Sequence, residues 1–345
     1  MQLPREVIVG NEILELIGDI CKRLGFSKSA LVVVGPHTRH ITGQRITDLL
    51  DDAGIDVNQF IVSSFTVKDV RTVEEKIMAL KPQVVLGTGG GTKIDVAKLG
   101  SARQGVPFIS IPTTASHDGI ASCVVSLKGL NKPYSNMAQS PMVIVADTSV
   151  ITQAPHRFAA SGCGDVVAKF TAVRDWELAH KAKNEYYGEY AASLSLMSAK
   201  LVAEHADIIQ PGLEEGVRVL LEALISCGVA MSIAGSSRPC SGSEHLFSHA
   251  LDLIAPNPAM HGEQCGVGTI MMARLHGMDW KRVKETLEKV GAPTTAEELG
   301  IEPEHVVQAL MQAGTIRPER YTILEEGRLN YDSAEKLARA TGVIE

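Results

Sequence analysis

The stretch Val84–Asp95, VVLGTGGGTKID, decides the fold of the first part of the chain. Its opening run is typical of a buried strand, and the glycines lead into a predicted helix that extends to about Arg103. Glycines at such a turn let the backbone approach a ligand closely, and the start of the helix offers free N–H groups to a phosphate. The pattern is neither the G-x-G-x-x-G fingerprint nor a Walker A loop. We interpret the turn as a binding site for the pyrophosphate of a dinucleotide; the alternative is a tight turn without a ligand.

Strands and helices alternate on both sides of this stretch. The alternation predicts βαβ units and a mainly parallel sheet, so we expect a Rossmann-like α/β nucleotide-binding domain over residues 1–150. Ala121–Tyr134 interrupts the alternation and predicts a β-hairpin. The other predicted strands are Ala30–Val34, Val57–Val62, Pro107–Ile111 and Met142–Ala146, and the other predicted helices of this domain are Thr42–Ala53 and Val70–Leu80.

From about residue 151 onward, every periodic segment favours helix over strand. A chain of 345 residues is too long for one ordinary core, so a second domain is expected, and we predict that it is all-helical and covers residues 151–345. Its predicted helices are Phe158–Lys183, Glu185–Gln210, Leu213–Ala234, Ser243–Leu253, Gly266–Arg274, Trp280–Val290, Pro303–Gly314 and Ser333–Thr341.

The composition narrows the class of protein. A net charge of −7 argues against a nucleic-acid partner and against an anionic membrane surface. We find no apolar run that reaches the length of a membrane span, and the first residues, MQLPREVIVGNEI, lack the features of a signal peptide. The six cysteines are scattered without a C-x-x-C pair, which predicts reduced thiols in a cytoplasmic protein.

A second stretch, Ser243–Glu263, reads SEHLFSHALDLIAPNPAMHGE and carries three histidines. His245 and His249 are four residues apart, so they project from one face of the predicted helix. The prolines that follow end this helix, and His261 is expected in the loop beyond it. Imidazoles brought together in this way hold a divalent metal if a carboxylate joins them. The alternative is that each histidine makes an ordinary hydrogen bond.

Asp165 is the acid best placed to complete such a site with His245 and His261. It stands in the segment SGCGD, just inside the predicted start of a helix, where a carboxylate usually serves as a cap or a dipole partner. One aspartate and two histidines leave coordination positions open for water or substrate. Separately, His117 and Asp118 follow a predicted strand, at the end where open α/β sheets bind their ligands.

Taken together and in order, these motifs resemble one superfamily over nearly the whole chain. The glycine turn, the segment PTTAS (112–116), Asp165, His245 and His261 form the pattern of glycerol dehydrogenase, the iron-type alcohol dehydrogenases and dehydroquinate synthase. Within it, the segments SHDGIAS (116–122), AVRDW (172–176), GSEH (242–245) and RPERYTIL (317–324) are similar to the archaeal sn-glycerol-1-phosphate dehydrogenase family. The chain departs from the pattern at Cys123, where proline is expected. It also has Lys169 where the iron-type enzymes carry another histidine ligand, which favours a three-ligand zinc site.

The resemblance implies a reaction and a set of residues. Dihydroxyacetone phosphate would be reduced reversibly to sn-glycerol 1-phosphate by NADH or NADPH, supplying the backbone of ether lipids. Zn2+ would be held by Asp165, His245 and His261. Asp118, Asp165 and His249 would contact the substrate and take part in catalysis, with His249 as the candidate proton relay. The implied dinucleotide contacts are Gly89, Gly90, Gly91, Thr92, Lys93, Ile94, Asp95, Thr113, Thr114, Ala115, Ser116 and Ser122.

The sequence leaves several properties open. It does not choose between NAD and NADP, because no clean acidic residue closes the second strand. We expect a homo-oligomer of unstated size. The alternative functions are a polyol dehydrogenase acting on glycerol, a dehydroquinate-synthase-like lyase, and a non-catalytic dinucleotide-binding regulator. The cations that could bind a substrate phosphate are Lys128, Lys132, Arg157, Lys169, Arg238, Arg317 and Arg320.

Overall fold

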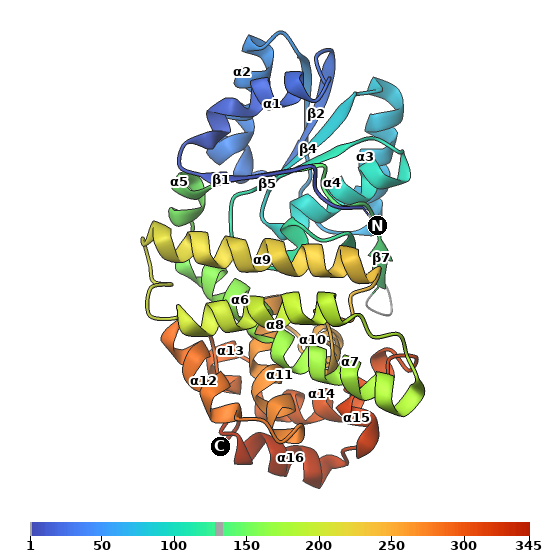
Figure 1. Ribbon diagram of the computed structural model, residues 1–345, viewed down its shortest axis with the longest axis vertical. Coiled ribbons are helices and arrows are strands. Elements are labelled where there is room, and N and C mark those ends of the chain that lie inside the picture. The colour runs from blue at the N-terminus through green and yellow to red at the C-terminus, as the bar shows by residue number, and fades with distance from the viewer. Residues whose placement is uncertain (1, 128–133) are drawn as a thin grey trace. The chain divides into compact units, whose positions relative to one another are not determined.

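The structure is a computed structural model and describes residues 2–127 and 134–345. The chain forms two compact units (Figure 1). Unit 1 consists of Met1–Ala115, Gly119–Pro155 and Pro211–Leu221, and unit 2 of Ser116–Asp118, His156–Gln210 and Glu222–Glu345. The functional domains over residues 1–150 and 151–345 stay a prediction.

Unit 1 is built on a six-stranded sheet in which all neighbouring strands run parallel, in the order β1-β8-β5-β4-β2-β3. The predicted parallel sheet is confirmed. Strands β6 and β7 form a separate antiparallel pair, as a hairpin requires, but the second strand begins only where the predicted hairpin ended, and residues 128–133 of that prediction lie outside the described residues. The edge strand β1 is an addition to the predicted strands; its residues are not fully buried, and its sequence, EVIVG, lacks the all-apolar pattern of a central strand. The strands are β1 (Glu6–Gly10), β2 (Ser29–Val34), β3 (Asp56–Ile61), β4 (Val84–Gly89), β5 (Phe108–Pro112), β6 (Val124–Leu127), β7 (Tyr134–Met137) and β8 (Val143–Asp147).

The strand order places the glycine turn at a topological switch point. After β2 the chain adds β3 on one side of it, whereas β4, β5 and β8 follow on the other side. The carboxyl ends of β2 and β4 therefore flank the point at which the winding reverses, where open α/β sheets bind their ligands. Strand β4 ends at Gly89, and the next helix, α4 (Gly91–Arg103), begins directly after Gly90.

The core of unit 1 follows from the alternation of side chains along the strands. Val32 and Val34 of β2 belong to one buried cluster with Ile46 and Leu50 of α2, while the buried Val33, between them in the sequence, faces the opposite side of the sheet. Both faces are thus covered. The predicted helix Thr42–Ala53 begins as a short π-helical turn before α2. The helical segments of this part are η1 (Ile13–Leu16), α1 (Ile17–Arg23), η2 (Arg39–Gly43), α2 (Gln44–Asp52), α3 (Val67–Leu80), α4, η3 (Asp118–Ile120) and α5 (Thr148–Thr152).

The rest of the chain is helical, as predicted. One predicted helix, Phe158–Lys183, is in fact two, which meet at Ala168, whose carbonyl accepts a hydrogen bond from the backbone N–H of Thr171, three residues later. The helices are α6 (His156–Val167), α7 (Lys169–Lys183), α8 (Glu189–Glu204), α9 (Glu214–Ala234), α10 (Ser243–Ile254), α11 (His261–Leu275), α12 (Trp280–Lys289), α13 (Ala296–Leu299), α14 (Pro303–Ile316), α15 (Ile323–Glu326) and α16 (Tyr331–Ala340).

Helices α6 and α11 touch through their backbones. A Cβ atom added to Gly262 of α11 would lie 1.9 Å from the carbonyl oxygen of Ser161, and one added to Gly164 of α6 would lie 2.2 Å from the carbonyl oxygen of Gly262. Only glycine permits this approach. The contact brings the residues after Gly164 and those beside Gly262 into one site.

Helix α9 corrects the expectation that no apolar run is long enough for a membrane span. Its 21 residues pass that test by length and composition. However, 61% of the relevant window is buried inside the structure, as in the core helix of a globular protein. Core burial therefore explains the apolar composition of this helix.

Candidate metal centre

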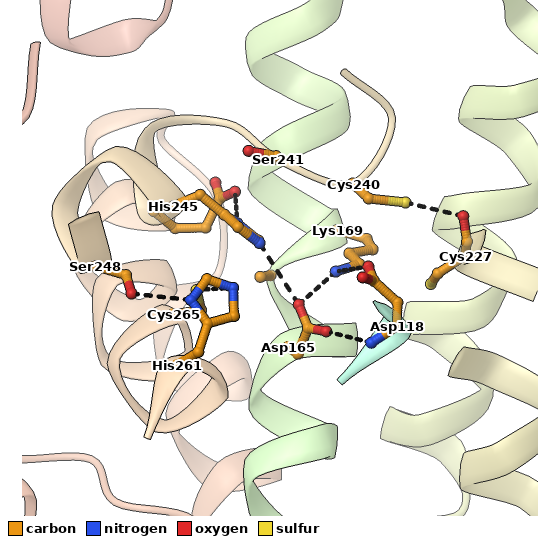
Figure 2. A network of polar contacts seen from close by, with 12 residues as sticks. Asp118, Asp165, Lys169, Cys227, Cys240, Ser241, His245, Ser248, His261 and Cys265 are labelled. Carbon is orange, nitrogen blue, oxygen red and sulfur yellow. Dashed lines mark hydrogen bonds and ion pairs between the residues drawn. The ribbon is translucent and has the colours of Figure 1, made fainter. Parts of the chain in front are cut away.

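Asp165 lies in the last turn of α6, and the prediction that it stands near a helix start is wrong. At that end the helix dipole opposes a carboxylate, so other groups must stabilise it. Its Oδ1 lies 2.6 Å from Lys169 Nζ, and its Oδ2 accepts a hydrogen bond of 2.8 Å from the backbone N–H of Asp118 (Figure 2). Burial by itself would raise the pKa of Asp165, but Lys169 and the nearby histidines outweigh it and hold that pKa well below its usual range. The carboxylate is therefore ionised.

Lys169 is the buried cation of this cluster. Its Nζ bridges the two predicted aspartates, at 2.6 Å from Asp165 Oδ1 and 2.9 Å from Asp118 Oδ2. Burial disfavours the charged ammonium, yet the two carboxylates raise the pKa of Lys169 well above its usual value. A buried charge is tolerated only when it is paired in this way. The ammonium is thus committed to two protein carboxylates.

His245, near the start of α10, is held by acids at both of its ring nitrogens. Its Nδ1 lies 2.8 Å from Glu244 Oε1, and its Nε2 lies 3.5 Å from Asp165 Oδ1. Glu244 is itself fixed, since it accepts hydrogen bonds from the backbone N–H of Gly242 and from the hydroxyl of Thr171. A carboxylate on Nδ1 is the usual partner of a metal-ligating imidazole, because it sets the ring orientation and turns Nε2 toward the metal.

Protonation of His245 depends on the same acids. Burial lowers the pKa of this imidazole, but its polar neighbours outweigh burial and raise the pKa well above the usual value. We attribute the rise to Asp165 and Glu244 more than to the nearby Cys265. Burial raises the pKa of Cys265 and leaves its sulfur a neutral thiol.

His261 is the first residue of α11 and does not lie in a loop, which corrects the prediction. Its Nδ1 is 3.2 Å from Ser248 Oγ, so Nε2 is the nitrogen left for a metal. The ring centroids of His245 and His261 are 5.0 Å apart. Burial and the positive charge of His245 lower the pKa of His261 well below its usual value, so this imidazole is neutral.

His249 belongs to the same group of histidines. Its ring stacks on that of His261, with centroids 5.9 Å apart and an interplanar angle of 26°. Its Nδ1 is buried and makes no hydrogen bond with any residue that the structure describes. Burial, followed by the neighbouring His261 imidazole and the positive charge of Arg317, lowers the pKa of His249 well below its usual value. The ring is therefore a neutral imidazole with an unused nitrogen.

The predicted dinucleotide residues gather mainly in unit 1. Gly89 has a φ of 145°, which favours glycine, and its carbonyl accepts a hydrogen bond of 3.0 Å from the backbone N–H of Thr113. The turn and the segment after β5 are thus tied together. Asp95 Oδ1 and Lys98 Nζ form an ion pair of 3.0 Å, although without hydrogen-bond geometry. Ser116 groups with unit 2.

A buried lysine organises the loop that carries Ser122. Lys98 Nζ donates to the carbonyl oxygens of Gly119, Ser122 and Val124 at 2.8, 3.0 and 3.1 Å. The hydroxyl of Ser122 donates to the carbonyl of Val124. These bonds connect the helix after the glycine turn to the loop before the hairpin. Lys98 was not among the predicted site residues, since a lysine inside a helix gives no signal that it is buried.

Comparisons with known proteins agree with the geometry. The family model of the iron-containing alcohol dehydrogenases matches residues 8–155. A protein of Methanosarcina barkeri is 54% identical over 344 residues, covering 100% of this chain and 96% of its own length. One of Pyrococcus furiosus is 55% identical, with 100% and 99% covered. Both are named glycerol-1-phosphate dehydrogenase (NAD(P)+).

The chain belongs to the glycerol-1-phosphate dehydrogenase family. The predicted resemblance is thereby confirmed, and so is the prediction that the protein is an oxidoreductase. Among solved structures, a glycerol dehydrogenase from Schizosaccharomyces pombe superimposes with a TM-score of 0.80 at 22% identity, over 99% of this chain and 89% of that one. At this identity the likeness concerns the fold, and it confirms the predicted fold class.

The ligand atoms that this glycerol-1-phosphate dehydrogenase family member brings together in the buried cluster are of the kinds that bind zinc. The ligand atoms of His245, His261 and Cys265 all lie within 4.8 Å of one another, and Asp165 adjoins His245. Imidazole nitrogen, carboxylate oxygen and sulfur are ligands that zinc accepts. Cys265 was missed because the predicted helix began at Gly266. Had it begun at His261, Cys265 would have fallen four residues later on the same helical face.

Proposed function

We propose that the protein reduces dihydroxyacetone phosphate to sn-glycerol 1-phosphate with NADH or NADPH, in a reversible reaction that supplies the backbone of ether lipids. The observation that carries the proposal is the full-length match, at about 54% identity, to relatives that bear the name of this reaction's product and of NAD(P)+. The buried cluster in unit 2 supports the proposal, because ketone reduction requires groups that polarise the carbonyl and deliver one proton to the product oxygen.

We further propose that Asp165, His245 and His261 hold a zinc ion. Bound there, zinc would act as a Lewis acid on the ketone oxygen and leave positions open for substrate. The chain's own contribution is to fix the ligands. Glu244 and Ser248 orient the two imidazoles through their Nδ1 atoms, and Lys169 keeps the Asp165 carboxylate ionised.

We assign Asp118 and His249 to the substrate. The carboxylate of Asp118 is held by Lys169 at 2.9 Å and remains partly exposed, so it can accept a hydrogen bond from a hydroxyl group. His249 is neutral at physiological pH, and a neutral imidazole can donate a proton at one nitrogen and accept one at the other. His249 therefore passes on the proton that the product oxygen requires, and it does not itself carry an additional proton.

We assign the dinucleotide to unit 1; when bound, its reduced nicotinamide would supply the hydride. The proposed contacts are those of the glycine turn, of the first turn of α4, of the PTTAS segment and of Ser122. The absence of side chains at Gly89 and Gly90 and the free N–H groups at the start of α4 support a pyrophosphate at this turn.

We also infer a cytoplasmic homo-oligomer. The six cysteines are buried free thiols, which suits a reducing compartment. Tyr186, Tyr190 and Met197, on or beside α8, are 69%, 71% and 61% exposed, and apolar side chains so exposed suit a subunit contact.

The test is oxidation of NADH and of NADPH by the purified protein given dihydroxyacetone phosphate, with and without a strong chelator. Reduction of NAD+ by glycerol is followed in parallel. Chelator-sensitive oxidation with the phosphorylated ketone, and little activity with glycerol, is expected. Activity with glycerol alone would move the protein to the polyol dehydrogenases and refute the proposed substrate.

A further inference from the structure

The phosphate of the proposed substrate needs a cationic site, and the structure eliminates most of the cations that the sequence offered. Lys128 and Lys132 lie outside the described residues. The other eliminated cations already have carboxylate partners. Lys169 pairs with Asp118 and Asp165, Arg157 donates to both carboxylate oxygens of Glu263 at 2.6 and 2.8 Å, and Arg238 donates twice to Glu185.

Arg320 differs from these because its partners are neutral. Its guanidinium donates to the carbonyl oxygen of Ser241 at 2.6 Å and to the hydroxyl of Ser237 at 2.9 Å. Ser241 lies just before α10, four residues from His245 in the chain, and belongs to the cluster drawn in Figure 2. Burial, together with the charges of Arg317 and Arg238, lowers the pKa of Arg320 to about 9, although Glu185 and Glu244 oppose the shift. The side chain is anchored and half-buried, and its hydrogen-bond partners carry no negative charge.

Arg317 stands at the C-terminal end of α14, and its guanidinium makes no hydrogen bond or ion pair with any residue that the structure describes. A cation at this end of a helix would be favoured by the dipole alone. The guanidinium is half-buried, and burial lowers its pKa, with Glu319 as the one carboxylate that opposes the shift. An anionic partner would offset the cost of burying this charged guanidinium.

Both arginines lie beside α10. Arg320 is bonded to Ser241 just before that helix, and α14, whose C-cap residue is Arg317, packs against it. His249 belongs to α10, and its Nδ1 is buried without a hydrogen-bond partner among the described residues. The unused buried nitrogen of His249 and the guanidinium of Arg317, which has no hydrogen-bond or ion-pair partner among the described residues, are independent observations that point to a missing ligand. Paired guanidiniums match the oxygen atoms of a phosphate through several N–H donors.

We propose that Arg317 and Arg320 bind the phosphate group of a phosphorylated three-carbon substrate beside His249. The proposal rests on the proposed function and specifies its substrate subsite. It also accounts for the discrimination expected between dihydroxyacetone phosphate and glycerol, because an unphosphorylated substrate would leave the two guanidiniums unpaired.

The decisive variant is Arg317→Gln, since this side chain has no described protein partner to lose. We expect its KM for dihydroxyacetone phosphate and its inhibition constant for inorganic phosphate to rise roughly 10- to 100-fold, as for the loss of hydrogen bonds to a charged group. The melting temperature, the zinc content and the KM for NADH should not change. Arg317→Lys should recover part of the loss. Arg339→Gln, which removes an exposed arginine paired with Glu335, is the matched control.

Unphosphorylated dihydroxyacetone separates a phosphate site from a general defect. Arg317→Gln should lower kcat/KM much less for this ketone than for dihydroxyacetone phosphate. Equal losses with both ketones, or an unchanged KM and inhibition constant with the phosphorylated ligands, would overturn the proposal. Binding of inorganic phosphate, measured by calorimetry, tests the anion site independently of turnover. If the wild type binds phosphate, the variant does not, and dihydroxyacetone phosphate is not reduced, the proposed function fails while the anion site stands.

Discussion

The ammonium of Lys169 lies 2.6 Å from Asp165 Oδ1, and both side chains are almost completely buried. The two residues are one helical turn apart across the break between α6 and α7. The pairing keeps a metal-ligand candidate ionised in a site where burial alone would favour its neutral form. It also explains why a lysine can occupy a buried position beside a proposed cation site, since its charge is matched by Asp118 and Asp165.

Lys169→Met should destabilise the protein strongly. Removing one partner of a buried ionic cluster leaves uncompensated charge, and we expect a loss of about 3–5 kcal/mol in the free energy of unfolding. Added zinc should restore part of it, because a metal replaces the missing positive charge beside Asp165. Urea unfolding with and without zinc measures both effects. Lys181→Met, which breaks an exposed pair with Glu177, is the control and should cost less than about 1 kcal/mol.

His261→Ala and His249→Ala should separate metal binding from proton transfer. The first variant removes a proposed ligand, so zinc content and activity should disappear together. The second should keep stoichiometric zinc while turnover falls roughly 100-fold or more, because a general acid–base group contributes on that scale. Metal analysis of the dialysed proteins, combined with kcat, tests the assignment. Loss of zinc from His249→Ala would make His249 a ligand and refute its role as a relay.

Zinc binding to the metal-free protein at pH 7 should release about one proton. Asp165 has a depressed pKa and is already ionised, and His261 has a depressed pKa and is already neutral. His245 has a raised pKa and carries the proton that zinc must displace. As the pH rises through that raised pKa, the proton leaves without zinc, so the release should fall toward zero. Calorimetry in buffers of different ionisation enthalpy measures it.

The same titration tests Cys265, whose thiol is neutral because burial raises its pKa. If Cys265 were a fourth ligand, its thiol would also be deprotonated, and two protons would be released at pH 7. A release of two protons would contradict the proposed ligand set. A fourth protein ligand would also occupy a coordination position that the substrate needs.

Gly262→Ala should disrupt the site through packing alone. The new methyl group would lie 1.9 Å from the carbonyl oxygen of Ser161, which is backbone and cannot turn aside. We expect destabilisation of about 3 kcal/mol or more, at or beyond the usual upper range for overpacking, and weaker zinc binding because His261 precedes this glycine. Gly327→Ala, where an added Cβ meets nothing within 4 Å, should be close to neutral. Equal melting temperatures for the two variants would contradict the close contact of α6 and α11.

Much of the local structure could be predicted because its causes are local. The strand, glycine turn and helix of Val84–Arg103 are found as expected, and the division between α6 and α7 was missed because the residue at which they meet, Ala168, is a good helix former. The start of α11 was placed too late because no standard cap residue precedes His261. Because of that error, Cys265 was not considered as a possible metal ligand.

The sequence by itself determined the alternation of elements, the position of the glycine turn between a strand and a helix, and the histidines available for a metal. These follow from side-chain periodicity and from the backbone freedom of glycine, which act over a few residues. Only the tertiary structure decided which charges are paired. Lys169 is committed to Asp118, 51 positions away, and Arg238 to Glu185, while Arg317 keeps its charge unmatched. Such pairings depend on which distant segments meet and on how much water they exclude, and neither is encoded in a local pattern.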